Sequence, residues 1–91
     1  MKLISITDSS RKNKKLMAKF DDGKTVHFGL KGSSTYIDHK DDKKKDAYLA
    51  RHMKNENWND FKTAGSLSRY ILWNKPTLND SIADFKKKFK L

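Results

Sequence analysis

The sequence predicts an α+β fold: a three-stranded antiparallel β-meander over residues 1–30, followed by three α-helices that pack on it over residues 31–91. Apolar and polar residues alternate in three short segments before residue 30, which is the period of half-buried strands. Beyond residue 40 the apolar spacing becomes three and four, the period of amphipathic helices. A chain of 91 residues suits one hydrophobic core, so we expect a single domain, 1–91.

Each predicted strand carries its apolar residues at alternate positions. These residues are Ile4 and Ile6, then Leu16, Ala18 and Phe20, then Val26, Phe28 and Leu30. A two-residue Asp22-Gly23 turn would split this apolar set between the two faces of the sheet. A three-residue loop at 21–23, with Gly23 left-handed, sets Ala18 opposite Val26 and Leu16 opposite Phe28. We therefore expect the three-residue loop.

The first predicted helix runs from the aspartates within 41–46 to about Lys54, because acidic residues favour a helix N-terminus. Leu49 and Met53 share its apolar face. The connection at 9–15 contains four cations in its last five residues and no apolar residue, so we expect an exposed basic loop there.

The second predicted helix begins near 63–66 and runs to Trp73, because the Pro-containing segment 74–76 stops it. The third begins after Thr77, which forms an approximate capping box with Asp80. One stripe of this third helix is apolar: Leu78, Ile82, Phe85 and Phe89.

The composition excludes several classes of function. There is no cysteine, which excludes disulfides, thiolate zinc sites and thiol catalysis. No segment approaches the ~20 apolar residues of a membrane span, and the first residues are too polar for a signal peptide, so we expect a soluble, unexported protein. The 21 cations outnumber the 11 acidic residues, and the net charge of +10 favours attraction to polyanions.

Three lysine-rich clusters, at 11–15, 43–45 and 86–90, are the candidates for binding nucleic acid through its phosphates. The candidate residues are Arg11, Lys12, Lys14, Lys15, Lys43, Lys44, Lys45, Lys86, Lys87 and Lys88. The alternative is that these lysines only make the protein soluble and are spread over all faces. If the clusters point in three directions, the polyanion argument loses most of its weight.

The expected nucleic-acid partner is double-stranded DNA, bound without sequence specificity. Only three arginines, Arg11, Arg51 and Arg69, offer the planar fork that reads guanine, and they lie far apart in the chain. Aromatic residues could instead stack on unpaired bases, but in so small a domain they are expected in the core: Tyr36, Tyr48, Trp58 and Tyr70.

No metal, cofactor or catalytic residue is expected. The histidines, His27, His39 and His52, fit no zinc signature, and the aspartates within 38–46 lack the spacing of a calcium loop. The Gly/Ser segment 29–34 lacks the spacing of a phosphate-binding loop and is interpreted as a turn.

A series of short motifs runs through nearly two thirds of the chain. They are Phe28-Gly29-x-Lys31-Gly32, Tyr36-Ile37-Asp38-His39-Lys40-Asp41, Tyr48-Leu49-Ala50-Arg51-His52, Glu56-Asn57-Trp58, Thr63-Ala64-Gly65, Ser68, Leu72-Trp73-Asn74-Lys75-Pro76-Thr77-Leu78, Ser81-Ile82, Asp84 and Phe89. Together they resemble an uncharacterised family of small basic proteins from nucleocytoplasmic large DNA viruses, the giant-virus group. The chain departs from that pattern at 33–35, which is more acidic in the family, and at Leu67, where an aromatic residue is common.

The resemblance implies a viral origin, a domain of unknown function, and a place in the virion and in the host cytoplasm or viral factory during infection. Many of the motif residues specify the fold. A few polar ones do not, and they are a possible specific polar site: His39, Lys40, Arg51, His52 and Glu56. The competing interpretation is a buried hydrogen-bonded network that ties the loop 29–39 to the first helix.

These observations lead us to expect a non-enzymatic virion-associated protein that binds nucleic acid in genome packaging or tethering. The alternative is a minor capsid or scaffold protein that binds other virion proteins, for which an open edge strand of the meander is the natural surface. A nuclease built on His39, Arg51, His52 and Glu56 is the third and weakest hypothesis.

Overall fold

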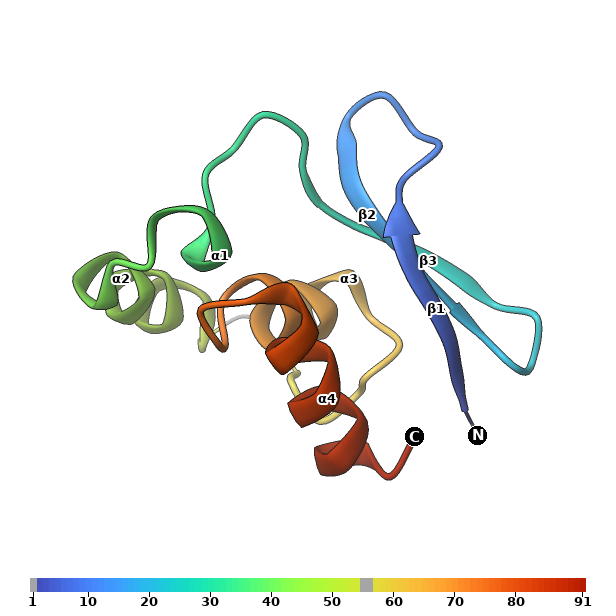
Figure 1. The fold of residues 1–91 in the computed structure, drawn as a ribbon. Helices are drawn as coiled ribbons and strands as arrows, with labels where there is room; N and C mark the ends of the chain where they lie inside the picture. The colour runs from blue at the N-terminus through green and yellow to red at the C-terminus, as the bar shows by residue number, and fades with distance from the viewer. Residues whose placement is uncertain (1, 55–56) are drawn as a thin grey trace.

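The computed structural model describes residues 2–54 and 57–91 and has the predicted α+β fold (Figure 1). The strands are β1 (Leu3–Asp8), β2 (Lys14–Phe20) and β3 (Thr25–Leu30), and they form one antiparallel sheet in the order β1-β2-β3. The helical elements are α1 (Tyr36–His39), α2 (Asp42–His52), α3 (Ala64–Leu67), the π-helical turn η1 (Ser68–Leu72) and α4 (Leu78–Phe89). None of the helices in the described part of the chain is long and apolar enough to cross a membrane.

The register of the β2–β3 hairpin is the predicted one. Leu16 pairs with Phe28 and Ala18 pairs with Val26. The Phe20 amide donates to the Lys24 carbonyl, and Gly23 has a φ of 87°, so the three-residue loop with a left-handed glycine is confirmed.

Strand β1 corrects the predicted alternation. Its pairing passes from Leu3 opposite Phe20 to Ser5 opposite Lys19, so a bulge at Ile4 adds one residue to β1. A bulge reverses the faces of the residues on one side of it. Leu3 is therefore buried and Ile4 is 64% exposed, and the expectation that Ile4 and Ile6 share the core face was wrong.

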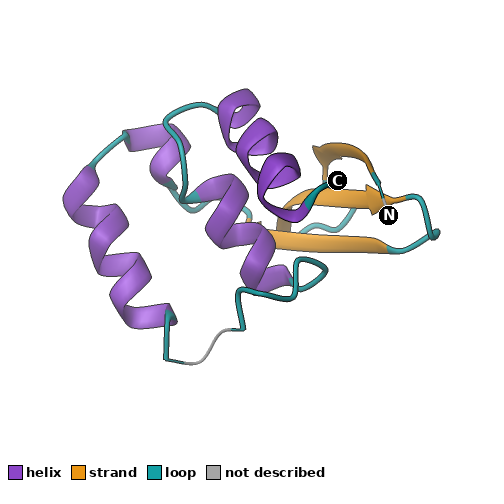
Figure 2. Ribbon diagram, turned by 90° about the horizontal axis from the view of Figure 1, so that it is seen from below, coloured by secondary structure: helices purple, strands orange, loops and turns teal. Residues whose placement is uncertain are grey.

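The core lies between one face of the sheet and the helical layer formed by α3, η1 and α4 (Figure 2). The sheet contributes the buried side chains of Leu3, Leu16, Ala18, Phe20 and Phe28. The helices contribute those of Leu67, Ile71, Leu72 and Phe85. Leu78, Ile82 and Phe89 pack around this cluster, which confirms the apolar stripe predicted for α4. One continuous core thus joins the two halves of the chain.

The predicted helix starts are confirmed by their caps. The side chain of Asp41 accepts the amides of Lys43 and Lys44, that of Thr63 accepts the Ser66 amide, and that of Thr77 accepts the Asp80 amide. The second predicted helix is α3 continued by η1, where the Trp73 amide donates to the Ser68 carbonyl in a π-type bond that the sequence did not predict.

Helix α2 buries a different face from the predicted one. Tyr48 is its buried residue, whereas Met53 is 63% exposed. The reason is tertiary, because the Tyr48 ring stacks on Trp73, which lies 25 positions further along the chain, and this contact decides which side of α2 faces the protein.

Gly29 marks a close approach between β3 and η1. Its φ is +79°, and a Cβ there would lie 2.8 Å from Leu72 Cδ1 and 3.1 Å from Lys15 Cβ. Leu72 is itself buried, so it cannot move aside without disturbing the core. Gly23 also has a positive φ, but a Cβ there would meet nothing within 4 Å.

We predict that Gly29→Ala lowers the free energy of unfolding by ~2 kcal/mol or more, because it adds a steric clash to left-handed backbone strain. The matched control Gly23→Ala should cost only the strain, ~1 kcal/mol. Urea denaturation of both variants measures the difference. Equal losses would show that the contact with Leu72 has no energetic weight.

Candidate functional site

The three lysine-rich clusters lie in three separate parts of the molecule (Figure 1). The first cluster, 11–15, is at one end of the sheet. Arg11 and Lys12 lie in the β1–β2 loop, but Lys14 and Lys15 begin β2 and are half-buried, so the expected exposed loop over 9–15 was wrong for these two residues. Residues 43–45 are in α2, on the far side of the helical layer, and 86–90 are in the last turns of α4, near the two chain ends. The ten candidate residues therefore do not form one continuous footprint, and the argument from total charge is weakened accordingly.

Three cluster lysines make internal contacts. Lys15 Nζ donates to the Ser33 carbonyl at 3.0 Å, and Lys45 Nζ donates to the Asn74 carbonyl at 2.7 Å. Lys45 also lies over the Tyr36 ring, and Lys88 lies over the Tyr70 ring. Lys14 is half-buried. The other cluster residues are exposed: Arg11, Lys12, Lys43, Lys44, Lys86 and Lys87.

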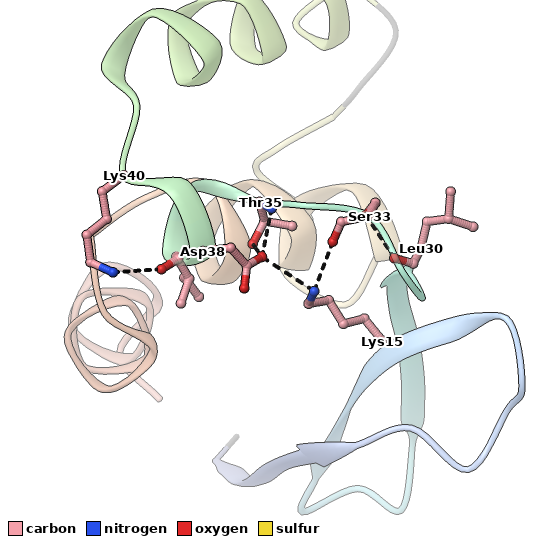
Figure 3. A network of polar contacts seen from close by, with 7 residues as sticks. Lys15, Leu30, Ser33, Thr35, Asp38 and Lys40 are labelled. Atoms are coloured by element: carbon pink, nitrogen blue, oxygen red, sulfur yellow. Dashed lines mark hydrogen bonds and ion pairs between the residues drawn. The ribbon is translucent and has the colours of Figure 1, made fainter.

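Lys15 belongs to a polar network that fixes the connection between β3 and α1 (Figure 3). Asp38 accepts the Thr35 amide at 2.8 Å and the Thr35 hydroxyl at 2.9 Å, and it forms an ion pair with Lys15 at 3.5 Å. The Ser33 hydroxyl donates to the Leu30 carbonyl at 2.8 Å. The network ties the loop after β3 to β2 and α1, whereas the competing interpretation expected a buried network that reaches the first predicted helix, now α2.

His39 and Lys40 have local structural contacts. His39 Nδ1 accepts the Asp41 amide at 3.0 Å, and its ring lies 5.4 Å from that of Trp73. Lys40 ends α1 in a left-handed conformation, and its Nζ donates to the Ile37 carbonyl. Glu56, another candidate for the polar site, lies outside the described residues.

Tyr48 lies between two aromatic rings. The Trp73 ring is 4.3 Å away and nearly parallel, at 4°, and the His52 ring is 4.2 Å away at 29°. Two rings at such distances must stack on opposite faces of Tyr48, so no face is left for a base. Cations cover Trp58 and Tyr70 in a similar way, and Tyr36 is buried. These aromatics are packing residues, as expected for a small domain.

A cavity of about 580 Å³ lies where the end of the sheet, α2 and the α3–η1 helix meet. Lys14, Leu30 and residues 33–35 line it from the sheet side, and Arg51 and His52 line it from α2. The third wall comes from α3, η1 and the residue after them: Ala64, Gly65, Ser68, Leu72 and Trp73. A lysine of the first cluster and two residues of the predicted polar site thus meet at one place.

The cavity is cationic. Lys14 stands opposite Leu30 in the β2–β3 pairing, and both line the cavity. Within 2–54 and 57–91, neither the Lys14 amine nor the Arg51 guanidinium forms an ion pair or a hydrogen bond, and no carboxylate lines the cavity. Two uncompensated cations beside serine and threonine hydroxyls are groups that bind an anion.

Residues 4–52 match a family of unknown function, DUF5754. The chain belongs to this family. The matched residues include the sheet, α1 and α2, and therefore Lys14, Arg51 and His52, whereas the wall formed by α3 and η1 lies beyond them. No curated protein and no solved structure matches the chain.

Of the four residues of the nuclease hypothesis, the structure describes His39, Arg51 and His52 in this DUF5754 chain, and Glu56 lies outside the described residues. Arg51 and His52 line the cavity, but His39 does not. Among the described residues there is no group of three or more His, Cys, Asp or Glu side chains that could hold a metal ion.

The sequence predicted no site role for Gly65 and Ser68, and it predicted a turn for the segment 29–34, which contains Ser34, yet all three residues line the cavity. Small residues of this kind are common in turns and helix starts, so no spacing distinguishes them. The only signal was the occurrence of Gly65 and Ser68 in the motifs of the resemblance.

Asp38 gives the polar network a pH dependence. The Thr35 amide, with the Thr35 hydroxyl and Lys15, lowers the pKa of Asp38 below its usual value, against the smaller opposing effect of burial. A carboxyl whose pKa is lower in the folded state stabilises the fold above its unfolded pKa of ~3.9, and this stabilisation is lost as the pH falls through the folded value.

We predict that Asp38→Asn lowers stability at pH 7, and that the difference from the parent protein shrinks as the pH falls below ~4. Chemical denaturation of both proteins at a series of pH values measures the difference in their free energies of unfolding. Asp8→Asn, at an exposed position in β1, is the matched control and should change stability little. A difference that is independent of pH would contradict the role assigned to the Asp38 carboxylate.

Proposed function

We propose that this protein binds nucleic acid without catalysing a reaction, and that its main phosphate contacts lie along one cationic edge of the molecule. This cationic edge comprises Arg11, Lys12, Lys14, Lys31 and Arg51. The hydrogen bond from the Lys31 amide to the Asn13 carbonyl joins the β1–β2 loop to the end of β3, and the cavity brings Lys14 and Arg51 together.

The observation that carries the proposal is that the cations of this edge lack acidic partners. In the described part of the chain the salt bridges are Lys15 with Asp38 and Lys62 with Asp22, and neither involves the cationic edge. Cations without carboxylate partners remain available to neutralise phosphates and release their counterions.

The arrangement favours duplex backbone contact over base recognition. Arg69 stacks against Trp58 and Tyr70 and is not available as a reader of guanine. The aromatic rings that could stack on unpaired bases are occupied by other side chains. The partner we propose is therefore double-stranded DNA, recognised by its charge.

The setting we propose is a virus particle, with a role in genome packaging or tethering, and the host cytoplasm or viral factory during infection. The support for this setting is the resemblance of the motifs from Phe28 to Phe89 to the giant-virus family. The exposed lysines of α2 and α4 would add long-range attraction to the same partner.

We predict that the affinity for duplex DNA falls with salt, with a log–log slope of about −4 to −6 for five or six phosphate contacts. Fluorescence anisotropy with a labelled duplex at several salt concentrations measures the slope. Lys12→Gln should reduce the slope by about 1, because it removes one contact. Lys19→Gln, at an exposed position in β2 outside the cationic edge and the lysine-rich clusters, is the matched control. Binding that does not change with salt would contradict the proposal.

The second candidate, a minor capsid or scaffold protein, is favoured by one feature of the sheet. Strand β1 is an edge strand, and Ile4 at its bulge is 64% exposed. An edge of this kind can pair with a strand of another protein. Absence of duplex binding at low salt, together with binding to a virion protein that Ile4→Lys abolishes, would favour this candidate over the first.

A further inference from the structure

We infer that the cavity between the end of the sheet, α2 and η1 is a binding site for a phosphate monoester. The phosphate could belong to the end of a nucleic acid chain or to a free nucleotide, which present the same chemical group. The first source rests on the proposed function. The recognition of the phosphate itself rests only on the residues of the cavity.

The charges of the cavity fit a dianion. Lys14 and Arg51 line it, and among the described residues neither forms an ion pair and no carboxylate lines the cavity. A phosphate monoester carries a charge of about −1.5 to −2 at neutral pH, whereas a phosphate inside a nucleic acid chain carries one negative charge. The two cations therefore match a terminal phosphate better than an internal one.

The donors of the cavity also fit a phosphate. Arg51 offers a planar fork that binds two oxygens at once, and Lys14 offers a flexible point charge. Of the hydroxyls that line the cavity, those of Ser33 and Thr35 donate to the Leu30 carbonyl and to Asp38. Ser34 and Ser68 donate no such bond to any of the described residues, so their hydroxyls can donate to a third phosphate oxygen.

The shape of the cavity favours the terminal phosphate of a nucleic acid chain over a phosphate inside the chain. Its volume of about 580 Å³ falls in the usual range for a small-ligand site. The phosphates of a duplex lie on a convex surface, which cannot enter a concavity without distortion. A free nucleotide or a 5′-phosphorylated chain end can enter it.

The aromatic wall of the cavity should contribute little to base recognition. Trp73 and Tyr48 line the cavity, but they are stacked on each other, and His52 stacks on Tyr48 as well. A base would meet ring edges and Leu72 and could not stack on Tyr48. The inference therefore requires that the phosphate decides affinity and that the identity of the base matters little.

The test uses isothermal titration calorimetry of the full chain with four probes: AMP, CMP, adenosine and inorganic phosphate. We expect AMP and CMP to bind with similar affinity, inorganic phosphate to bind to the same site, and adenosine to bind at least about tenfold more weakly than AMP. Arg51→Gln and Lys14→Gln should each weaken AMP binding by about tenfold, because each removes a charged hydrogen-bond donor.

Lys19→Gln, at an exposed position in β2, is the matched control and should leave AMP binding unchanged. Arg51 is exposed and forms no hydrogen bond or ion pair with the described residues, and equal thermal unfolding of Arg51→Gln and the parent protein would establish that the fold is intact. Equal binding of AMP and adenosine, no binding of any probe, or AMP binding that neither cavity variant weakens would overturn the inference.

A second arm compares a short single-stranded DNA that carries a 5′-phosphate with the same DNA ending in a 5′-hydroxyl. Tighter binding of the phosphorylated end, lost in Arg51→Gln, assigns the site to chain ends. Binding of AMP with no preference between the two ends assigns it to free nucleotides. The proposed function fails separately, through loss of salt-dependent duplex binding, and AMP binding would survive that failure.

Discussion

The candidate site depends on the stacking of Tyr48 against Trp73. Helix α2 stands at the periphery, and Tyr48 is the residue that it buries. Polar contacts also hold it, such as the bond from Lys45 to the Asn74 carbonyl and that from the Tyr36 hydroxyl to Asp42. An aromatic pair of this kind contributes ~0.5–1.5 kcal/mol beyond the area that it buries. Without it, Arg51 and His52 would lose their place at the cavity wall.

Two further constraints complete the cavity. Gly29 allows the end of β3 to approach Leu72, which sets the distance between the sheet and η1. Lys15 and Asp38 then hold the loop after β3 against α1, so residues 33–35 form a wall of fixed shape. Two adjacent lysines of the first cluster therefore have different roles. Lys15 bonds to the loop after β3 and to α1, and Lys14 remains available to a ligand.

The sequence predicted those features that depend on neighbours in the chain. The register of the β2–β3 hairpin followed from loop length, and the helix starts followed from Asp41, Thr63 and Thr77. It did not predict the bulge at Ile4, because an extra residue leaves no mark on a short alternating pattern. The buried side of α2 was also missed, because Leu49 and Met53 suggested a stripe that the distant Trp73 overrides. The cavity required the relative placement of three remote segments, which no local pattern encodes.

The placement of the lysine clusters shifts the emphasis from total charge to local geometry. The central claim is that the phosphates of duplex DNA contact the cationic edge. A titration of the ¹⁵N-labelled protein with duplex DNA, followed residue by residue in NMR spectra, tests it most directly. We predict that the largest amide shift changes fall at the cationic edge, in 11–14, at 31 and at 51. Changes of equal size in 86–90, or changes confined to that segment, would contradict the claim.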